Sequence, residues 1–72
     1  MTTEVTTTVP GNIWKVLVKE GDQVKKGDTL FIMEVMKTEV NHDSPVDGKV
    51  TKVNIVNDQE GLDPGTIAIV IE

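Results

Sequence analysis

Two stretches that contain β-branched and apolar residues lie on either side of a short segment near the middle of the chain. Residues 30–35 read LFIMEV and residues 38–42 read TEVNH, compositions that suit the pleated, half-buried surface of a β-strand. If both stretches are strands, the chain reverses at Met36 and Lys37. A two-residue turn of type I′ needs a positive φ at both central positions, which favours Asn-Gly or Gly-Gly over Met-Lys. The pattern therefore predicts a tight hairpin with an unfavourable pair of residues at its apex.

The rest of the chain is also typical of short strands. Val, Ile and Thr are abundant, residues that favour helices are sparse, and Gly and Pro recur along the 72 residues, which together favour an all-β fold. We expect one domain that spans residues 1–72. Its core should be thin, because a chain of this size buries only about 60% of the surface that it exposes when unfolded. The sequence has no Cys, so disulfides and thiolate metal sites cannot stabilise that core.

The charge of the chain narrows the choice of partner. The formal net charge is −5, with seven Lys and no Arg, which argues against binding to nucleic acid or to an anionic membrane because both require a basic patch. A protein partner is favoured instead. No apolar run approaches the ~18 residues of a membrane span, and the start of the sequence lacks the basic and apolar regions of a signal peptide. We therefore expect a cytoplasmic protein.

The sequence contains two copies of one unit. Gly11 aligns with Gly48, so that GNIWKVLV lies over GKVTKVNI; after one extra residue in the second copy, VKKGDTLFIME lies over LDPGTIAIVIE and Glu34 meets Glu72. A repeat of this kind predicts a pseudo-twofold structure in which two half-domains pack their apolar faces together as a flattened sandwich. The predicted hairpin would project from one end of the molecule, and the termini would lie near the other end.

Few residues could support catalysis or bind a metal. His42 is the only histidine, and Asp43 and Asp47 follow it closely, so the three could suggest a metal site. The same segment contains Pro and Asp-Gly, which mark a turn where Asp side chains bond to local backbone, and we favour this interpretation. Glu34 and Glu39 flank the hairpin symmetrically, and we expect both carboxylates to face solvent and to fix the setting of the hairpin.

Lys37 is the strongest functional candidate. A lysine in a turn usually serves only solubility, but this one lies at an apex that goes against turn preference, at the centre of the internal repeat, and between two strands long enough to hold it rigidly. A residue pair that goes against local turn preference in an otherwise consistent sequence points to function.

The residues around this apex resemble a known family. The segment GNIWKVLVKEGDQVKKGDTLFIMEVMKTEV is similar to the biotinyl/lipoyl attachment domains, whose pattern is Gly-x-Val, then Gly-Asp-x-Val-x-x-Gly-Asp-x-Leu, then Glu-x-Met-Lys. The later segment SPVDGKV resembles the opening of the second half of these domains. The resemblance implies a barrel-sandwich hybrid, a flattened β-barrel or sandwich of two four-stranded antiparallel sheets. The residues that match the pattern are Gly11, Gly21, Asp22, Val24, Gly27, Asp28, Leu30, Glu34, Met36 and Lys37.

The resemblance also implies a function. Biotin would be attached covalently to the ε-amine of Lys37 by a biotin protein ligase, with Glu34, Val35, Met36 and Thr38 as the flanking cofactor-binding residues. The modified domain would carry a carboxyl group between a biotin carboxylase site and a carboxyltransferase site. The carrier itself would catalyse nothing, bind no metal and be monomeric in isolation.

Three alternatives remain at this point. Lipoylation uses the same fold and the same lysine, but lipoyl domains usually read Asp-Lys-Ala at the apex, whereas Met36 precedes Lys37 here; some small attachment proteins accept both cofactors. An unmodified hybrid-barrel module for protein contacts would usually lack Met-Lys at the apex. An enzyme with its own active site is the least favoured.

The sequence departs from the family pattern at several positions. Thr38 follows the lysine where biotin domains commonly have Met. In the second half, Gln59-Glu60 stands where Gly-Asp is expected, and Thr66 and Ala68 replace the more usual Asp and Leu. We expect these differences to affect stability more than modification, because the second-half changes fall at the far turn and in the core.

Overall fold

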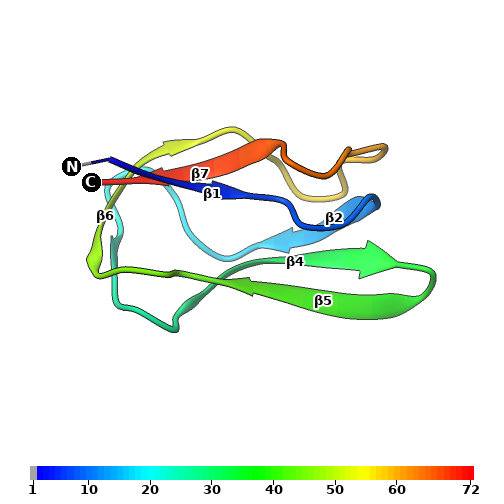
Figure 1. Cartoon of the computed structure of the whole chain (residues 1–72), viewed down its shortest axis with the longest axis horizontal. Helices are drawn as coiled ribbons and strands as arrows, with labels where there is room; N and C mark the ends of the chain where they lie inside the picture. The colour runs from blue at the N-terminus through cyan, green and yellow to red at the C-terminus, as the bar shows by residue number, and fades with distance from the viewer. Residues whose placement is uncertain (1) are drawn as a thin grey trace.

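The computed structural model describes residues 2–72, which form seven β-strands in two antiparallel sheets (Figure 1). Within this range the structure contains no helix, and therefore no helix that could span a lipid bilayer. The all-β prediction is confirmed. The strands are β1 (Thr3–Thr6), β2 (Asn12–Val16), β3 (Gln23–Val24), β4 (Thr29–Val35), β5 (Thr38–Asp43), β6 (Gly48–Val53) and β7 (Ile67–Ile71).

The two sheets have the strand orders β1-β7-β6-β3 and β2-β4-β5, and neither closes into a barrel. The predicted pair of antiparallel sheets is therefore present, with one difference: the second sheet has three strands instead of four. An isolated bridge between Gly11 and Leu62 occupies the place of the fourth. The chain cannot extend this bridge into a strand because Gly61, directly before it, adopts a φ of 72°, which turns the backbone out of the extended conformation.

The predicted pseudo-twofold symmetry is visible in the hydrogen bonds between loops. The N–H of Gly27 donates to the carbonyl of Ser44 at 2.8 Å, and in the other half the N–H of Gly65 donates to the carbonyl of Thr7 at 2.8 Å. Both glycines have a positive φ, of 95° and 84°, a conformation that a Cβ atom disfavours. The repeat in the sequence therefore corresponds to a repeat in structure.

One turn of the second copy lies one residue earlier in the chain than the sequence alignment predicts. The sequence comparison placed Gln59-Glu60 opposite Gly21-Asp22, but the structure places Asp58-Gln59 there. Gly21 and Asp58 both have a positive φ, of 95° and 63°. The side chains of Asp22 and Gln59 each accept a hydrogen bond from the backbone N–H three residues earlier, at 3.0 and 3.1 Å. The extra residue of the second copy therefore follows the turn, whereas the sequence alignment places it before the turn.

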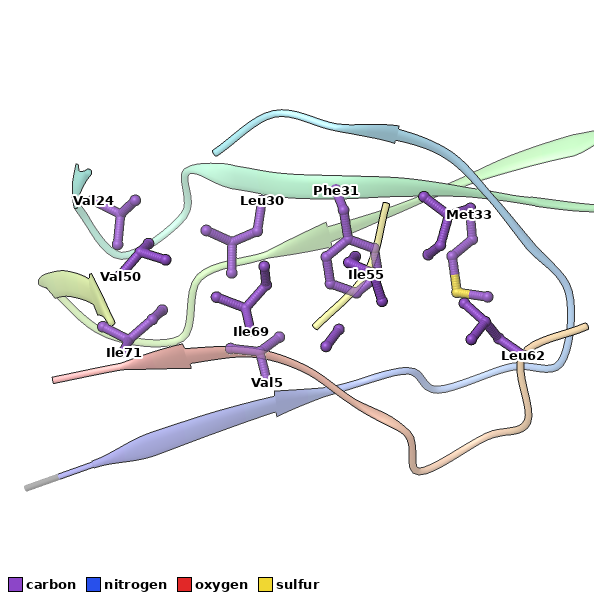
Figure 2. Packing of buried hydrophobic residues seen from close by; sticks show 12 residues of the cluster. Val5, Val24, Leu30, Phe31, Met33, Val50, Ile55, Leu62, Ile69 and Ile71 are labelled. Carbon is purple, nitrogen blue, oxygen red and sulfur yellow. The ribbon is translucent and has the colours of Figure 1, made fainter. Parts of the chain in front are cut away.

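The core lies between the two sheets (Figure 2). Leu30 and Phe31 are adjacent in sequence and both fully buried, because the pairing of β4 with β5 shifts register between Thr29 and Phe31. Burial of a side chain of this size stabilises the fold by about 1.5–3 kcal/mol relative to exposure. The buried apolar residues are Val5, Ile13, Val24, Leu30, Phe31, Met33, Val50, Ile55, Leu62, Ala68, Ile69 and Ile71.

His42 belongs to this core. It lies on β5 with 6% of its surface exposed, and its ring stacks on Phe31 with 4.4 Å between the ring centroids. Its Nε2 atom is 3.1 Å from the hydroxyl of Thr8. His42 pairs with Phe31 across the sheet in the same way that Val5 pairs with Ile69 in the other half. The histidine thus takes the place of an apolar residue.

Asp43 and Asp47 do not converge on His42. Asp43 accepts a hydrogen bond from the hydroxyl of Thr29 at 2.9 Å, and Asp47 accepts one from the backbone N–H of Lys26 at 2.7 Å. The expectation that these carboxylates bond to local backbone is wrong, because both partners are distant in sequence. The hydroxyl of Ser44 makes the local bond instead, to the carbonyl of residue 46 at 2.6 Å.

Burial of His42 predicts a dependence of stability on pH. Desolvation lowers the pKa of His42 from its ordinary value of 6.5, although the backbone of Val40 and the charge of Asp43 raise it. Between the lowered pKa and about 6.5 the unfolded chain binds more protons than the folded chain, so the free energy of unfolding rises with pH in that window and falls as the pH drops through it. We expect His42→Val, which copies Val5 of the other half, to remove this contribution.

The measurement is urea unfolding of both proteins at about pH 7.5 and about pH 5.5, on either side of the usual histidine titration. The wild type should lose more stability than the variant between the two values, because carboxylates titrate in both proteins and their effect cancels in the comparison. Equal losses of stability in the two proteins would show that His42 does not contribute to the pH dependence.

Candidate functional site

The hairpin between β4 and β5 has the predicted geometry. The two strands pair up to Val35 and Thr38, which leaves only Met36 and Lys37 in the turn. Their φ angles are 49° and 64°, so both central residues adopt the left-handed conformation that a type I′ turn requires. Each such residue costs about 1 kcal/mol or more when it carries a Cβ. The strand pairing imposes a conformation that neither residue favours by itself.

Both residues of the turn are exposed. Met36 has 93% of its surface accessible to solvent, the largest value among the exposed large apolar side chains, and Lys37 is also exposed. The hairpin projects from the end of the molecule opposite to the two termini (Figure 1), as the internal repeat predicts. The amine of Lys37 is therefore accessible to a macromolecular partner, and an exposed thioether lies directly beside it in the sequence.

Exposure does not distinguish Lys37 from the other lysines. All seven lysines are exposed, and Lys15 lies on β2 with its amine 5.7 Å from the centroid of the Trp14 ring. What distinguishes Lys37 is backbone conformation, because no other lysine in residues 2–72 has a positive φ. The remaining lysines lie in strands or in the turns around the glycines: Lys15, Lys19, Lys25, Lys26, Lys49 and Lys52.

The carboxylates beside the turn face solvent, as predicted. Glu34 and Glu39 are paired across the hairpin and both are exposed. Like charges directly opposite each other in a sheet are mildly destabilising, so this pair is not explained by stability. Of the other two residues predicted to flank the lysine, Thr38 is exposed and Val35 is half-buried.

Two shallow hollows lie on the surface formed by residues 2–72. One, of about 130 Å³, includes Glu34 on its wall together with Trp14 and Asp58. The other, of about 330 Å³, lies between β1 and β5 and includes Val5 and His42. Neither hollow includes Lys37. The amine stands at an exposed apex, an arrangement suited to modification by a partner protein that surrounds it.

Sequence reasoning missed one residue at the base of the hairpin. From the sequence, Gly11 is an anchor of the repeat alignment and a match to the family pattern, with no role assigned to it. In the structure its Cα lies against the end of β4, where a Cβ atom would meet the carbonyl oxygen of Glu34 at 2.8 Å. Its position at the start of the repeat was the available signal, because the equivalent Gly48 also approaches the end of a strand.

Comparison with known proteins agrees with this geometry. The family model described as biotin-requiring enzyme, which covers biotinyl and lipoyl domains, matches residues 1–71. The alpha subunit of mitochondrial methylcrotonoyl-CoA carboxylase from Dictyostelium discoideum is 41% identical over 63 residues, which cover 88% of this chain and 9% of that protein. Pyruvate carboxylase from Bacillus subtilis is 35% identical over 68 residues, which cover 94% of this chain and 6% of that protein.

Among solved structures, the urea carboxylase of Kluyveromyces lactis superposes with a TM-score of 0.90 and 30% identity. The superposition covers 100% of this chain and 6% of the carboxylase. The chain thus corresponds to a small part of each of these relatives. The family model, in contrast, matches nearly the whole of this chain. This protein belongs to the biotinyl/lipoyl attachment domain family.

Proposed function

We propose that residues 1–72 are a single biotin carboxyl carrier domain, with biotin joined through an amide bond to Lys37. The observation that supports this most directly is the turn geometry: Lys37 combines exposure with a positive φ of 64° at the apex of a two-residue hairpin turn. The relatives compared above are carboxylases, so the lipoyl alternative is not favoured. The unmodified interaction module also has no support among them.

In the attachment step, Lys37 is the nucleophile. Its ammonium group first gives up a proton, and the amine then attacks the carboxyl carbon of biotinyl-adenylate, forming a C–N bond as AMP leaves. The flanking residues would be read by the ligase: Met36 offers an exposed apolar contact, and Glu34 offers an exposed negative charge on the strand that leads into the turn. Val35 and Thr38 form the last pair that holds the turn.

After attachment, the domain acts as a carrier. Biotin supplies a ring nitrogen that accepts and releases a carboxyl group. The protein contributes the position of the tether: the hairpin holds Lys37 away from the body of the domain, and the termini lie at the other end (Figure 1). A biotin carboxylase and a carboxyltransferase could therefore each bind the hairpin end, and tethering would raise the local concentration of the carried group at both sites.

The domain is proposed to act without catalysing a reaction itself, as a partner of a biotin protein ligase and of the two carboxylase activities. The cytoplasmic location and the monomeric state expected from the sequence stay predictions.

We expect Lys37→Arg to abolish biotinylation, because arginine keeps the positive charge but removes the nucleophilic amine. The domain is incubated with a biotin protein ligase, ATP and biotin, and its intact mass is measured. Lys52→Arg, at an exposed lysine on β6, is the matched control and should be biotinylated like the wild type. A mass increase corresponding to biotin in the Lys37→Arg protein would contradict the assignment.

The strain at Met36 predicts a gain in stability on substitution. Met36→Asn should raise the free energy of unfolding by about 1 kcal/mol, because Asn tolerates the positive φ and the exposed Met side chain contributes no burial. This corresponds to a rise in Tm of about 4–8 °C for a domain of this size. Met36→Leu is the control, since it keeps an unfavourable side chain at the same φ. If Met36→Asn unfolds at the same temperature as Met36→Leu, the turn is not strained by Met36.

A further inference from the structure

Gly11 makes an unusually close approach to the base of the hairpin. A Cβ atom on Gly11 would lie 2.8 Å from the carbonyl oxygen of Glu34 and 2.9 Å from Cγ2 of Val35. Both distances are shorter than a Cβ atom can normally tolerate, and one of the two neighbours is backbone. The φ of Gly11 is not among the positive values, so glycine is needed here for space and not for backbone conformation.

The contact is placed where it can affect the turn. Glu34 and Val35 are the last two residues of β4, and Met36 and Lys37 follow them directly. Any outward movement of the Glu34 carbonyl must therefore be passed on to the turn. Relaxation cannot come easily from the Gly11 side, because its N–H donates to the carbonyl of Leu62 at 3.1 Å and its carbonyl accepts from the N–H of Leu62 at 2.9 Å.

We infer that Gly11 is a positioning residue for Lys37: the absence of its side chain allows the end of β4 to lie where the turn presents the lysine amine to the modifying enzyme. This inference rests on the proposed attachment of biotin to Lys37. It adds a residue that is 26 positions away from the lysine in the sequence and that lies against the end of β4.

The pseudo-twofold symmetry supplies a matched control. Gly48 is the equivalent of Gly11, and a Cβ atom on Gly48 would lie 2.6 Å from the carbonyl oxygen of Glu72 and 2.7 Å from Cγ2 of Ile71. The steric defect produced by alanine is thus similar at both positions. Gly48, however, lies against the C-terminal end of the chain, which is at the opposite end of the molecule from the hairpin (Figure 1).

The test compares Gly11→Ala with Gly48→Ala in the full chain. Initial rates of biotinylation are measured with a biotin protein ligase at a temperature where unfolding curves show both variants to be folded. Because an error of about 1 Å in placing a reacting group can cost about 100-fold in rate, we expect kcat/KM to fall at least about 10-fold for Gly11→Ala. Gly48→Ala should stay within about 2-fold of the wild type, since its defect lies far from the reacting amine.

A spectroscopic measurement separates positioning from general destabilisation. The backbone amide resonances of Met36 and Lys37 should shift in Gly11→Ala and stay in place in Gly48→Ala.

Adding Val35→Ala to Gly11→Ala removes one of the two close contacts and should restore part of the rate, with Val35→Ala alone as the reference. If Gly11→Ala does not fold, the double variant replaces it; if Gly48→Ala does not fold, Val5→Ala, which destabilises the other half, replaces it.

Equal loss of rate per folded molecule in Gly11→Ala and in its control would overturn the inference, as would a wild-type rate in Gly11→Ala. A wild-type domain that the ligase does not modify at Lys37 would instead overturn the proposed function. In that case the amide shifts of Met36 and Lys37 still decide whether Gly11 sets the geometry of the turn.

Discussion

The pairing of β4 with β5 is the constraint on which the rest of the structure depends. It continues to Val35 and Thr38 and so leaves two residues to reverse the chain, both at positive φ. The conformation is unfavourable for Met and Lys, and it persists because the strands on either side are fixed. Leu30 and Phe31 anchor β4 in the core, so the energy that holds the exposed apex comes from burial at a distance from it.

The two halves of the repeat share a scaffold and differ at the functional hairpin. The scaffold is shared: the same loop hydrogen bonds and the same close glycine approaches occur in both halves. In the first half the differences lie at the hairpin and its strands, where Met36 and Lys37 form the turn and His42 occupies the position of the apolar Val5. In the second half they lie at the turn of Asp58 and at Gly61. The first half therefore combines the shared scaffold with an exposed turn that presents Lys37.

Local pattern was sufficient to predict the all-β class, the hairpin with its two strands, its exposed carboxylates and the repeat, because each depends on composition, turn chemistry or self-similarity along the chain. The features that the sequence did not predict depend on long-range contacts and on local backbone conformation. The burial of His42 depends on Phe31 and Thr8, and the bond of Asp47 to Lys26 spans a separation of 21 residues. A one-residue shift at Asp58 and an interrupted fourth strand at Gly61 follow from backbone conformations that composition does not specify.

The central claim is that the ligase recognises the Lys37 amine by its position on the folded domain, so that the sequence around the lysine is not sufficient by itself. The most direct test compares ligase kcat/KM for the folded domain with that for a peptide of residues 30–43, which contains the same residues around the lysine. A flexible peptide must be ordered on binding, and misplacement of the amine is costly. We expect the peptide to react at least about 100-fold more slowly. Equal values for the domain and the peptide would contradict the account.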